Sequence, residues 1–293
     1  MKLEGLSILV TGGAGFIGSH LVEKLAKENR VVVYDNFSSS VVSVRDLMNI
    51  RVIRGDILDE KKLTQAMSGV EVVFHLAVAC VRLSLGSPRH VHNVNATGTL
   101  STLLAAKKAR VKRFVYISSS EVYGTAQKTK IDEGHPIHPT TVYGMSKYMG
   151  EEYTRLFGAE LPSIIVRPFN TYGPRSHFDG VYGEVIPRFV IRALNEKQPI
   201  IFGKGNQTRD FTYVTDSVNG IMKAAQSDEL LGDAVNIAYG KEVSINDIGR
   251  TICSATGLGF RPIFRPSRPN DVARHAADIT KAKRLLRFEA KIS

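Results

Sequence analysis

The sequence predicts an α/β protein with a doubly wound parallel sheet and a smaller α/β lobe in its C-terminal part. In the first half of the 293-residue chain, short apolar runs alternate with helical patterns. Such alternation places helices on both faces of a parallel sheet. After residue 168, Gly and Pro interrupt shorter elements. We therefore expect a large domain over 1–168 and a substrate lobe over 169–293, of which about 205–255 returns to the large domain.

The strands of the large domain are expected where β-branched or aromatic residues form short runs between turn residues. In chain order these runs are 6–10, 31–34, 52–54, 72–74, 114–117 and 163–166. The helical patterns between them cover 16–29, 60–67, 90–110 and 141–157. Further helices are expected at 215–226 and 244–255.

The composition is that of an ordinary globular protein, with 43% hydrophobic and 23% charged residues, which excludes intrinsic disorder as the main state. The longest nearly apolar stretch, 70–81, is shorter than the roughly 18 residues of a membrane span. The two cysteines have no CxxC partner, which excludes a disulfide framework and a Cys-based zinc site. The histidines show no metal spacing either. We expect a soluble cytoplasmic protein without a metal.

The net charge of +11 has two interpretations. One is a surface for nucleic acid or a membrane, and the other is a site for a phosphorylated ligand on a generally basic protein. The basic residues are spread along the chain rather than gathered in one run. Together with the motifs below, this favours a small phosphate ligand, with neither nucleic acid nor membrane as a partner.

A glycine-rich loop follows the first expected strand and opens the first expected helix, with glycines at Gly12, Gly15 and Gly18. Glycine is needed where the turn is tight, where the backbone approaches a pyrophosphate and where the helix packs on the strand. The helix N-terminus then offers free N–H groups and a partial positive charge to the phosphates. The loop in this setting predicts a dinucleotide site.

Two carboxylates that follow neighbouring strands are candidates for the nucleoside end of that site. Asp35 lies 17 residues after Gly18, where a carboxylate accepts hydrogen bonds from an adenosine ribose and repels a 2′-phosphate. This favours NAD over NADP. Asp56 follows the third strand and could contact the adenine amino group. The alternative is that Asp56 is the N-cap of a following helical turn.

Tyr143 and Lys147 are four residues apart and share one face of an expected helix. A phenol with a pKa of about 10 is a poor base at neutral pH, and an ammonium group one turn away lowers that pKa. Upstream, a run of three serines and Glu121 follow the fifth strand, at the edge of the sheet where ligands bind. A serine hydroxyl there can hydrogen-bond a reacting oxygen. Glu121 is either a solvated loop acid or a general base.

As a set, these motifs resemble the extended short-chain dehydrogenase/reductase family, and more narrowly its nucleotide-sugar epimerases, dehydratases and decarboxylases. The resemblance covers nearly the whole chain, at 12–18, 35–36, 75–77, 118–124, 143–147, 167–175, 207–214 and 268–272. It implies a Rossmann-type fold, the cofactor NAD, and a sugar linked to a nucleoside diphosphate as substrate.

The resemblance also implies roles for the catalytic residues. Tyr143 would remove the proton from the sugar 4-hydroxyl while hydride passes from C4 to NAD. Lys147 would hold the nicotinamide ribose and lower the pKa of Tyr143, and Ser119 would hydrogen-bond the 4-oxygen. Ser120 stands where 4,6-dehydratases carry Asp, and Glu121 stands where they carry the base that takes the C5 proton.

The binding residues are carried over in the same way. Those implied for the cofactor are Gly12, Gly15, Phe16, Ile17, Gly18, Asp35, Asn36, Ser38, Asp56, Ile57, Leu76, Ala77, Asn95, Ser118, Tyr143 and Lys147. Those implied for the diphosphate, the nucleoside and the rim of the sugar pocket are Asn170, Arg175, Arg209, Arg268 and Asp271.

The step after the 4-keto sugar stays open between epimerisation, dehydration and decarboxylation. Ser120 weakens the usual dehydratase mechanism, and the Ser-Ser-Glu triplet resembles the loop of UDP-glucuronate decarboxylases. The segments 78–84 and 35–39 look more like epimerases. We favour a UDP-sugar 4-epimerase of the UDP-glucose/galactose type. The resemblance further implies a homodimer through the helices at 90–110 and 141–157. An NAD-binding regulatory protein, or an RNA-binding relative of the fold, is the non-enzyme alternative.

Overall fold

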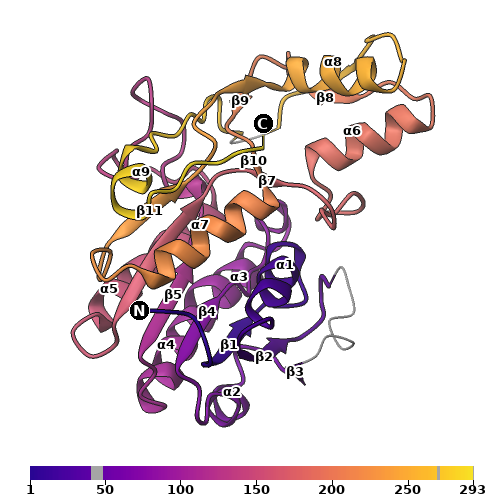
Figure 1. Cartoon of the computed structure of the whole chain (residues 1–293). Coiled ribbons are helices and arrows are strands. Elements are labelled where there is room, and N and C mark those ends of the chain that lie inside the picture. Colours follow the sequence, from indigo (N-terminus) through magenta and orange to yellow (C-terminus); the bar gives the residue numbers. More distant parts are fainter. Residues whose placement is uncertain (41–48, 269–270, 293) are drawn as a thin grey trace.

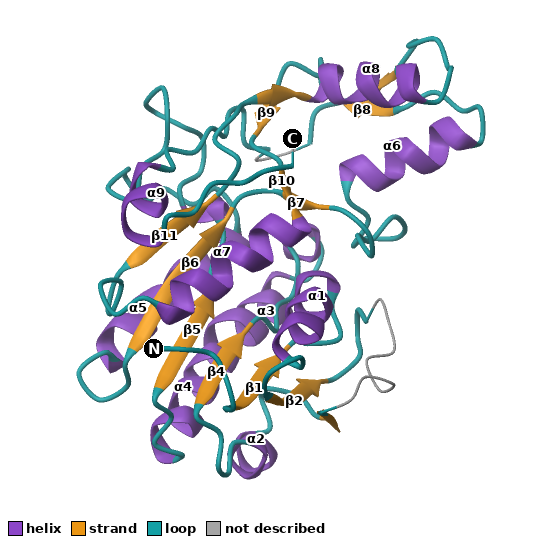
Figure 2. Ribbon diagram, in the orientation of Figure 1, coloured by secondary structure: helices purple, strands orange, loops and turns teal. Residues whose placement is uncertain are grey.

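The computed structural model describes residues 1–40, 49–268 and 271–292, and its centre is a seven-stranded sheet (Figures 1 and 2). The strand order is β3-β2-β1-β4-β5-β6-β11, with every neighbouring pair parallel. The strands are β1 (Ser7–Thr11), β2 (Arg30–Asp35), β3 (Ile50–Arg54), β4 (Val72–His75), β5 (Arg113–Ile117), β6 (Ser163–Pro168) and β11 (Ala234–Ile237). The predicted doubly wound sheet is confirmed.

Helices cover both faces of the sheet. One face carries α1 (Phe16–Leu25), α7 (Val214–Gln226) and α9 (Thr280–Leu286), and the other carries α2 (Glu60–Ala66), α4 (Gly98–Lys108) and α5 (Val142–Phe157). Successive side chains of a strand point to opposite faces. Ile8 and Val10 therefore join the core under α1, whereas Leu9 joins the core under α4. Burial of these apolar faces is what holds the layers together.

The helix predicted at 90–110 is a composite of three segments. It begins earlier than expected, as α3 (Pro88–His92), because proline is favoured in the first turn of a helix. A π-helical turn, η2 (Asn93–Thr97), then leads into α4. Single π turns inside α-helices occur frequently at functional sites. Here the π turn carries Asn95, whose side chain is buried against the loop that follows β4.

A small lobe lies beyond the C-terminal edge of the sheet and consists of α6 (Val185–Leu194), α8 (Ile245–Ala255), β8 (Ile200–Phe202) and β13 (Ile263–Arg265) (Figure 1). β8 pairs in parallel with β13, and Phe189, Ile201 and Ile245 form the lobe's own core. Within the segment 205–255, α7 and β11 belong to the large sheet's layers, while α8 packs on α6. The domain division itself stays a prediction.

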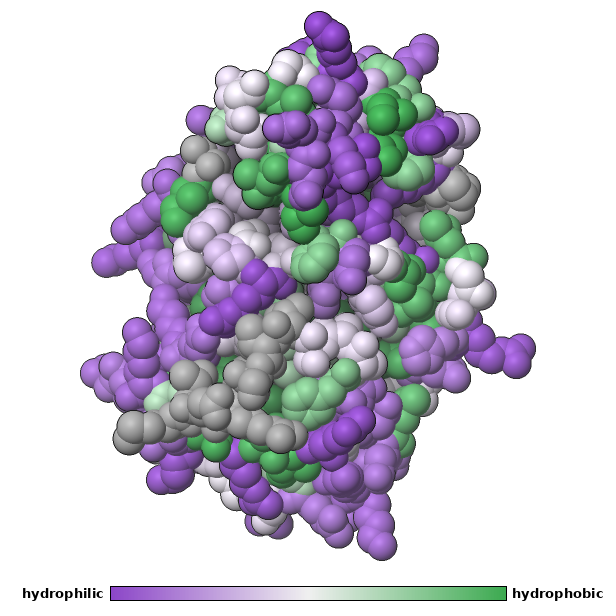
Figure 3. All heavy atoms as spheres, turned by 90° about the vertical axis from the view of Figure 1, so that its right-hand side faces the viewer, coloured by the Kyte–Doolittle hydropathy of each residue, from purple (hydrophilic) through white to green (hydrophobic). Residues whose placement is uncertain are grey.

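Short elements connect the lobe to the sheet. They are η1 (Val81–Leu85), η3 (Ser120–Val122), β7 (Thr171–Tyr172) paired with β10 (Thr212–Tyr213), and β9 (Thr208–Arg209) paired with β12 (Val243–Ser244). Figure 3 shows one side of the molecule, where apolar residues occur in small groups among polar ones. Within the described part of the chain, no helix is long and apolar enough to cross a membrane.

Candidate active site

The glycine loop lies at the C-terminal edge of the sheet, next to the point where the strand order changes direction between β1 and β4. Open α/β sheets bind ligands at this point. Gly12 has φ +69°, and a Cβ there would lie 2.7 Å from the backbone nitrogen of Ala77. A Cβ on Gly18 would lie 2.1 Å from the carbonyl oxygen of Gly12. The loop is therefore packed closely against its own backbone and against the segment after β4, and larger residues would disrupt it.

The N-terminus of α1 is open to an anion. Its N-cap is Gly15, without a side-chain cap, and its first turn carries no acidic residue. The first N–H groups of a helix and its dipole favour phosphate. Phe16 and Ile17, also expected at the cofactor, form the start of this helix. These features fit the pyrophosphate of a dinucleotide.

Asp35 ends β2 beside this loop. Its Oδ2 accepts a hydrogen bond from the backbone of Ala14 at 2.9 Å, and its Oδ1 accepts one from Phe37 at 2.8 Å. The carboxylate is thus fixed against the glycine loop, at the position where a ribose would meet it. Asn36 follows directly, and its side chain accepts a hydrogen bond from the backbone of Ser38 at 3.0 Å.

Asp56 lies next to the same strand end. Its Oδ2 accepts a hydrogen bond from Asn36 Nδ2 at 3.1 Å, and its Oδ1 accepts one from the backbone of Leu58 at 3.0 Å. The N-cap of α2 is Asp59, which accepts from the backbone of Lys62. Asp56 starts the turn before α2, because the backbone of Asp59 also donates to its carbonyl at 3.0 Å. Asp56 therefore caps a turn, as the alternative held, and its contact with Asn36 also places it close to the expected nucleoside end.

Four other residues expected at the cofactor are held within the protein. Asn95 donates to the oxygen of Ala79 at 3.0 Å and to Ser146 Oγ at 3.1 Å, and its own oxygen accepts from the nitrogen of Ala79 at 2.8 Å. Ser118 donates to Glu151 at 2.6 Å. Ile57 and Leu76 are buried in the core. Asn95 and Ser118 therefore shape the pocket wall with side chains that protein groups already hold.

Lys147 lies on α5, whose N-cap Thr141 accepts a hydrogen bond from Gly144 at 3.0 Å. The Nζ of Lys147 donates to the carbonyl of Ile117 at 2.6 Å and lies 4.4 Å from the ring centroid of Tyr116. Burial lowers the pKa of Lys147 to about 7. A buried lysine with a pKa lowered toward neutral pH is typical of functional sites.

Tyr143 lies one turn before Lys147, as predicted. Burial raises the pKa of the Tyr143 phenol, and a hydrogen bond with the Ser119 side chain opposes that rise. Ser119 also accepts a hydrogen bond from the backbone of Glu121 at 3.2 Å, which begins η3. Ser120 is buried in that turn. The structure thus brings Tyr143, Ser119 and Lys147 together, with Glu121 beside them.

A cleft of about 490 Å³ opens between this edge of the sheet and the small lobe, a size that suits a small-molecule ligand. The predicted residues that line it are Glu121, Asn170, Arg209, Arg268 and Asp271. Arg209 pairs with Asp271 at 2.6 Å, and the guanidinium of Arg268 lies 4.1 Å over the ring of Phe202. The Nδ2 of Asn170 is buried without a protein partner. Pro269 and Asn270, part of the same motif, lie outside the described residues.

Arg175 is not among the residues that line this cleft. Its Nη2 forms an ion pair with Glu23 of α1 at 2.5 Å, and its Nη1 lies 3.3 Å from Ser19 Oγ. The positive charge of Arg175 is therefore already matched by a carboxylate on the large domain. This position favours a structural contact with α1 over the predicted contact with substrate.

The cleft also contains charged residues that sequence reasoning assigned no role. Arg82 of η1 forms an ion pair with Glu184 at 3.7 Å, across the cleft from the sheet edge to the small lobe. Arg188 of α6 lines the same space. Desolvation raises the pKa of Glu184, while Arg82 and Arg188 lower it. The place of Arg82 in the segment after β4 is a signal in the sequence. Arg188 lies in α6 and Glu184 is the N-cap of that helix, which no sequence pattern predicted.

Glu121 is an acidic group in the cleft wall whose charge acts on the Tyr143 phenol. Desolvation in the cleft raises its pKa, while Arg209 lowers it. A carboxyl group with a raised pKa is a better proton acceptor once ionised, and such groups cluster at functional sites. The alternative of a solvated loop acid is not supported by this position in the cleft wall.

A phosphate-accepting loop at a strand-order switch, a carboxylate at the end of β2 and a Tyr–Ser–Lys group beside a cleft define a dinucleotide-dependent α/β enzyme. The comparisons with known proteins make this specific. The chain belongs to the NAD dependent epimerase/dehydratase family, whose model matches residues 8–238.

The similar proteins extend over nearly the whole chain. A Methanocaldococcus jannaschii protein, provisionally named a UDP-glucose 4-epimerase, is 39% identical and covers 95% of this chain and 92% of its own. An epimerase structure from Methanothermobacter thermautotrophicus has a TM-score of 0.94 at 36% identity, covering 99% and 89% of the two chains. A Thermotoga maritima UDP-glucose 4-epimerase with UDP-glucose has a TM-score of 0.92 at 35% identity, covering 98% and 94%. Relatives at 33% and 30% identity are named as a decarboxylase and a dehydratase.

Proposed function

We propose that this protein is an NAD-dependent UDP-sugar 4-epimerase, of the UDP-glucose/galactose type, that works through a 4-keto intermediate. The observation that carries the proposal is the junction of three side chains beside the cleft. Tyr143 is hydrogen-bonded with Ser119, and the buried Lys147 lies one turn along the same helix. Several of the similar proteins are named as UDP-sugar 4-epimerases.

The residues present fit NAD. The glycine loop and the open N-terminus of α1 suit the pyrophosphate. Asp35 would accept hydrogen bonds from the adenosine ribose, and its charge would repel a 2′-phosphate. When bound, NAD supplies the acceptor for the hydride of C4 and the means to return it.

Tyr143 is the group that moves the proton. The phenolate would take the proton of the 4-hydroxyl as the C4–H bond breaks, and would give it back when the alcohol forms again. The Lys147 ammonium and the Ser119 hydroxyl would lower the pKa of the Tyr143 phenol, because an opposite charge and a hydrogen-bond donor both stabilise the phenolate. Ser119 would also hold the 4-oxygen in place.

The cleft suits the diphosphate of the substrate. Guanidinium groups match phosphate geometry with two parallel hydrogen bonds, and Arg82, Arg188, Arg209 and Arg268 all line the cleft. The unpartnered Nδ2 of Asn170 is a buried donor, and such a donor is costly unless a ligand satisfies it. We assign these groups to the diphosphate and the nucleoside.

Glu121 favours a second candidate function, a nucleotide-sugar dehydratase or a UDP-uronate decarboxylase. In a dehydratase, a base beside the 4-keto sugar would remove the C5 proton, and an acid would protonate the leaving 6-oxygen. Ser120 occupies the place of that acid and is a poor proton donor. A dehydratase built on this site would therefore lack the acid that protonates the leaving 6-oxygen. Decarboxylation needs no such acid.

The test is product analysis. We would incubate the purified protein and NAD with UDP-glucose, UDP-N-acetylglucosamine, UDP-glucuronate and dTDP-glucose, and follow each by NMR and mass spectrometry. Unchanged mass with a new C4 stereoisomer is the expected result. Loss of water or of carbon dioxide as the main reaction would replace the epimerase with the second candidate. No reaction of any sugar, with NAD still bound, would favour a regulatory protein.

We also propose that the protein forms a homodimer through α4 and α5. These neighbouring helices expose large apolar side chains, namely Leu104 on α4 and Met145, Met149 and Leu156 on α5. Exposed apolar surface on two packed helices is typical of an interface, and two-fold dimers are the commonest assembly. The cytoplasmic location stays a prediction.

A further inference from the structure

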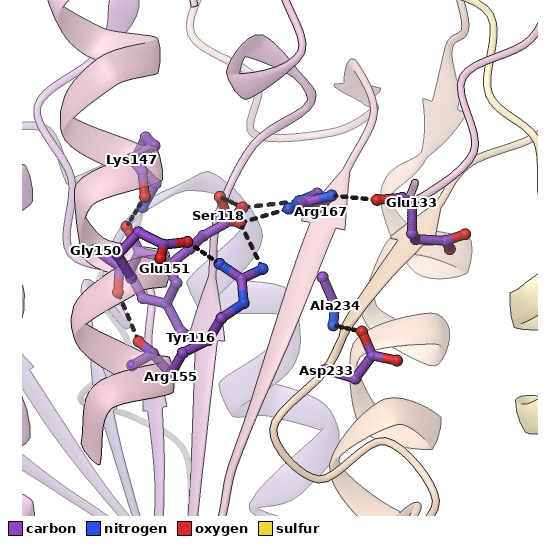
Figure 4. A network of polar contacts seen from close by, with 12 residues as sticks. Tyr116, Ser118, Glu133, Lys147, Gly150, Glu151, Arg155, Arg167, Asp233 and Ala234 are labelled. Atoms are coloured by element: carbon purple, nitrogen blue, oxygen red, sulfur yellow. Dashed lines mark hydrogen bonds and ion pairs between the residues drawn. The ribbon is translucent and has the colours of Figure 1, made fainter. Parts of the chain in front are cut away.

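A buried ion-pair network joins the proposed catalytic helix to the sheet (Figure 4). Its centre is Glu151, four residues after Lys147 on α5 and fully buried. Arg167 of β6 approaches its carboxylate with two nitrogens, Nε at 2.8 Å from Oε1 and Nη2 at 2.6 Å from Oε2. Ser118 donates to Oε1 at 2.6 Å, and Arg155 lies 3.2 Å from Oε2.

The network extends away from the site as well. Arg167 Nη1 donates to the hydroxyl of Tyr123 at 2.6 Å, and that hydroxyl donates to Asn236 of β11 at 2.7 Å. Buried ion pairs add little stability compared with apolar residues of the same size, because both charges lose their hydration. Stability alone is therefore a weak reason for this arrangement, and its place beside Lys147 points to the chemistry.

Lys147 has few groups that keep it charged. Among the residues that the structure describes, its Nζ donates to the carbonyl of Ile117 of β5. The groups that face it from the sheet are neutral at working pH, because burial raises the pKa of Tyr116 and lowers that of His75 to about 3. Within the described part of the chain, Glu151 is the carboxylate that opposes the effect of burial on the pKa of Lys147.

The charge of Glu151 is secured by its own partners. Arg167, Ser118 and Arg155 hold the pKa of the Glu151 carboxyl below its usual value, although burial alone would raise it. Among the described residues, Tyr116, Tyr123 and Tyr148 also face this carboxylate, and burial raises the pKa of all three. Glu151 is therefore a permanent negative charge one helical turn from the lysine.

We propose that Glu151 is a positioning residue that holds Lys147 in its ammonium form and anchors the end of β5 through Ser118. This rests on the proposed function of Lys147 in supporting the Tyr143 phenolate. Ser118 immediately precedes Ser119, so the same carboxylate fixes both groups that stabilise the phenolate. The catalytic helix and the serine loop are then aligned by one buried anion.

The sign of the effect follows from the charges. Burial sets the pKa of Lys147 at about 7 with Glu151 in place. Replacing the carboxylate with a neutral amide removes the group that raises this pKa, so the lysine loses its proton at lower pH. A shift of about one unit, within the range for one opposite charge nearby, lowers the ammonium fraction about tenfold well above the pKa.

The experiment compares Glu151→Gln with Arg155→Met, which removes an outer cation from Glu151 but leaves the carboxylate. The titration of Lys147 is followed by 13C NMR of labelled lysines, with the signal assigned by its absence in Lys147→Arg. The pH profile of kcat/KM for 4-epimerisation is the second readout. In Glu151→Gln both midpoints should move down by about one unit, with activity lost at pH 8 and retained at pH 6. Arg155→Met should keep the wild-type midpoints.

An unchanged Lys147 midpoint in a folded Glu151→Gln protein would overturn the proposal, even if thermal stability fell. If that variant does not fold, the double variant Glu151→Gln/Arg167→Met removes both charges of the pair and should show a smaller shift in the same direction. The NMR titration does not depend on turnover. A shifted titration in a protein that turns over no sugar would therefore refute the epimerase and keep the role of Glu151.

Discussion

Tyr143 is partly buried, and desolvation raises the pKa of its phenol, so the phenolate depends on its neighbours. Ser119 is the neighbour that hydrogen-bonds it directly. Ser119→Ala should lower kcat about 100-fold with little change in KM, because the lost hydrogen bond matters mainly when charge develops. Initial rates of 4-epimerisation measure this. A wild-type kcat in Ser119→Ala would contradict the role of Ser119.

A substitution of Glu121 alone distinguishes the two candidate functions. If the protein is an epimerase, Glu121 takes no proton, and Glu121→Gln should leave kcat nearly unchanged because the amide has almost the same shape. If the chemistry needs a base at C5, the same variant should lose about 100-fold or more. Steady-state rates on the preferred sugar decide this, and a large loss would count against the epimerase.

The sequence predicted the groups around Tyr143, such as Ser119, because each belongs to a short motif with a fixed spacing at the end of a strand or the start of a helix. It could not predict the pairs that fold together across the cleft, such as Arg82 with Glu184. The Glu151–Arg167 pair left a clue. Arg167 is a charged residue inside the apolar run of β6, and Glu151 lies four residues after Lys147 on a helix that faces the sheet. Charged residues in such positions are rarely buried unless they are paired with each other.

At the scale of the element, the turn into α1 decides cofactor binding. Gly12→Ala combines a strained positive φ with a Cβ placed 2.7 Å from the backbone of Ala77, so the loop must move. NAD affinity should fall more than tenfold, measured by calorimetry. Gly69→Ala is the matched control, because Gly69 has φ +72° with nothing within 4 Å of its Cβ. Equal NAD affinity in the two variants would contradict the assignment of the glycine loop to cofactor binding.

Elements with strong local patterns were predicted well, and elements defined by tertiary contacts were not. The strands of the first half are β-branched runs between turn residues, and all of them are present. Pro187 is one of the Gly and Pro residues expected to interrupt the elements after residue 168, whereas it lies in the first turn of α6, where proline is tolerated. β11 is four residues long and joins the sheet through β6, a partner far away in the sequence.

At the scale of the whole molecule, the apolar faces of α4 and α5 predict the assembly. Met145→Lys combined with Met149→Lys places two charges on that face and should convert a dimer into a monomer, because buried unpaired charge is costly. Analytical ultracentrifugation measures the mass. Leu194→Lys is the control, since Leu194 is 68% exposed on α6 in the small lobe. A dimer that survives the double variant would place the interface elsewhere.

The central claim is that hydride leaves C4 and returns to C4 while Tyr143 handles the proton. The most direct measurement uses UDP-glucose deuterated at C4, in ordinary water with NAD, and follows the isotope by NMR and mass spectrometry. The account predicts UDP-galactose of unchanged mass with deuterium kept at C4, and no product from Tyr143→Phe. Deuterium lost to solvent, deuterium moved to C6 with loss of water, or an active Tyr143→Phe variant would contradict it.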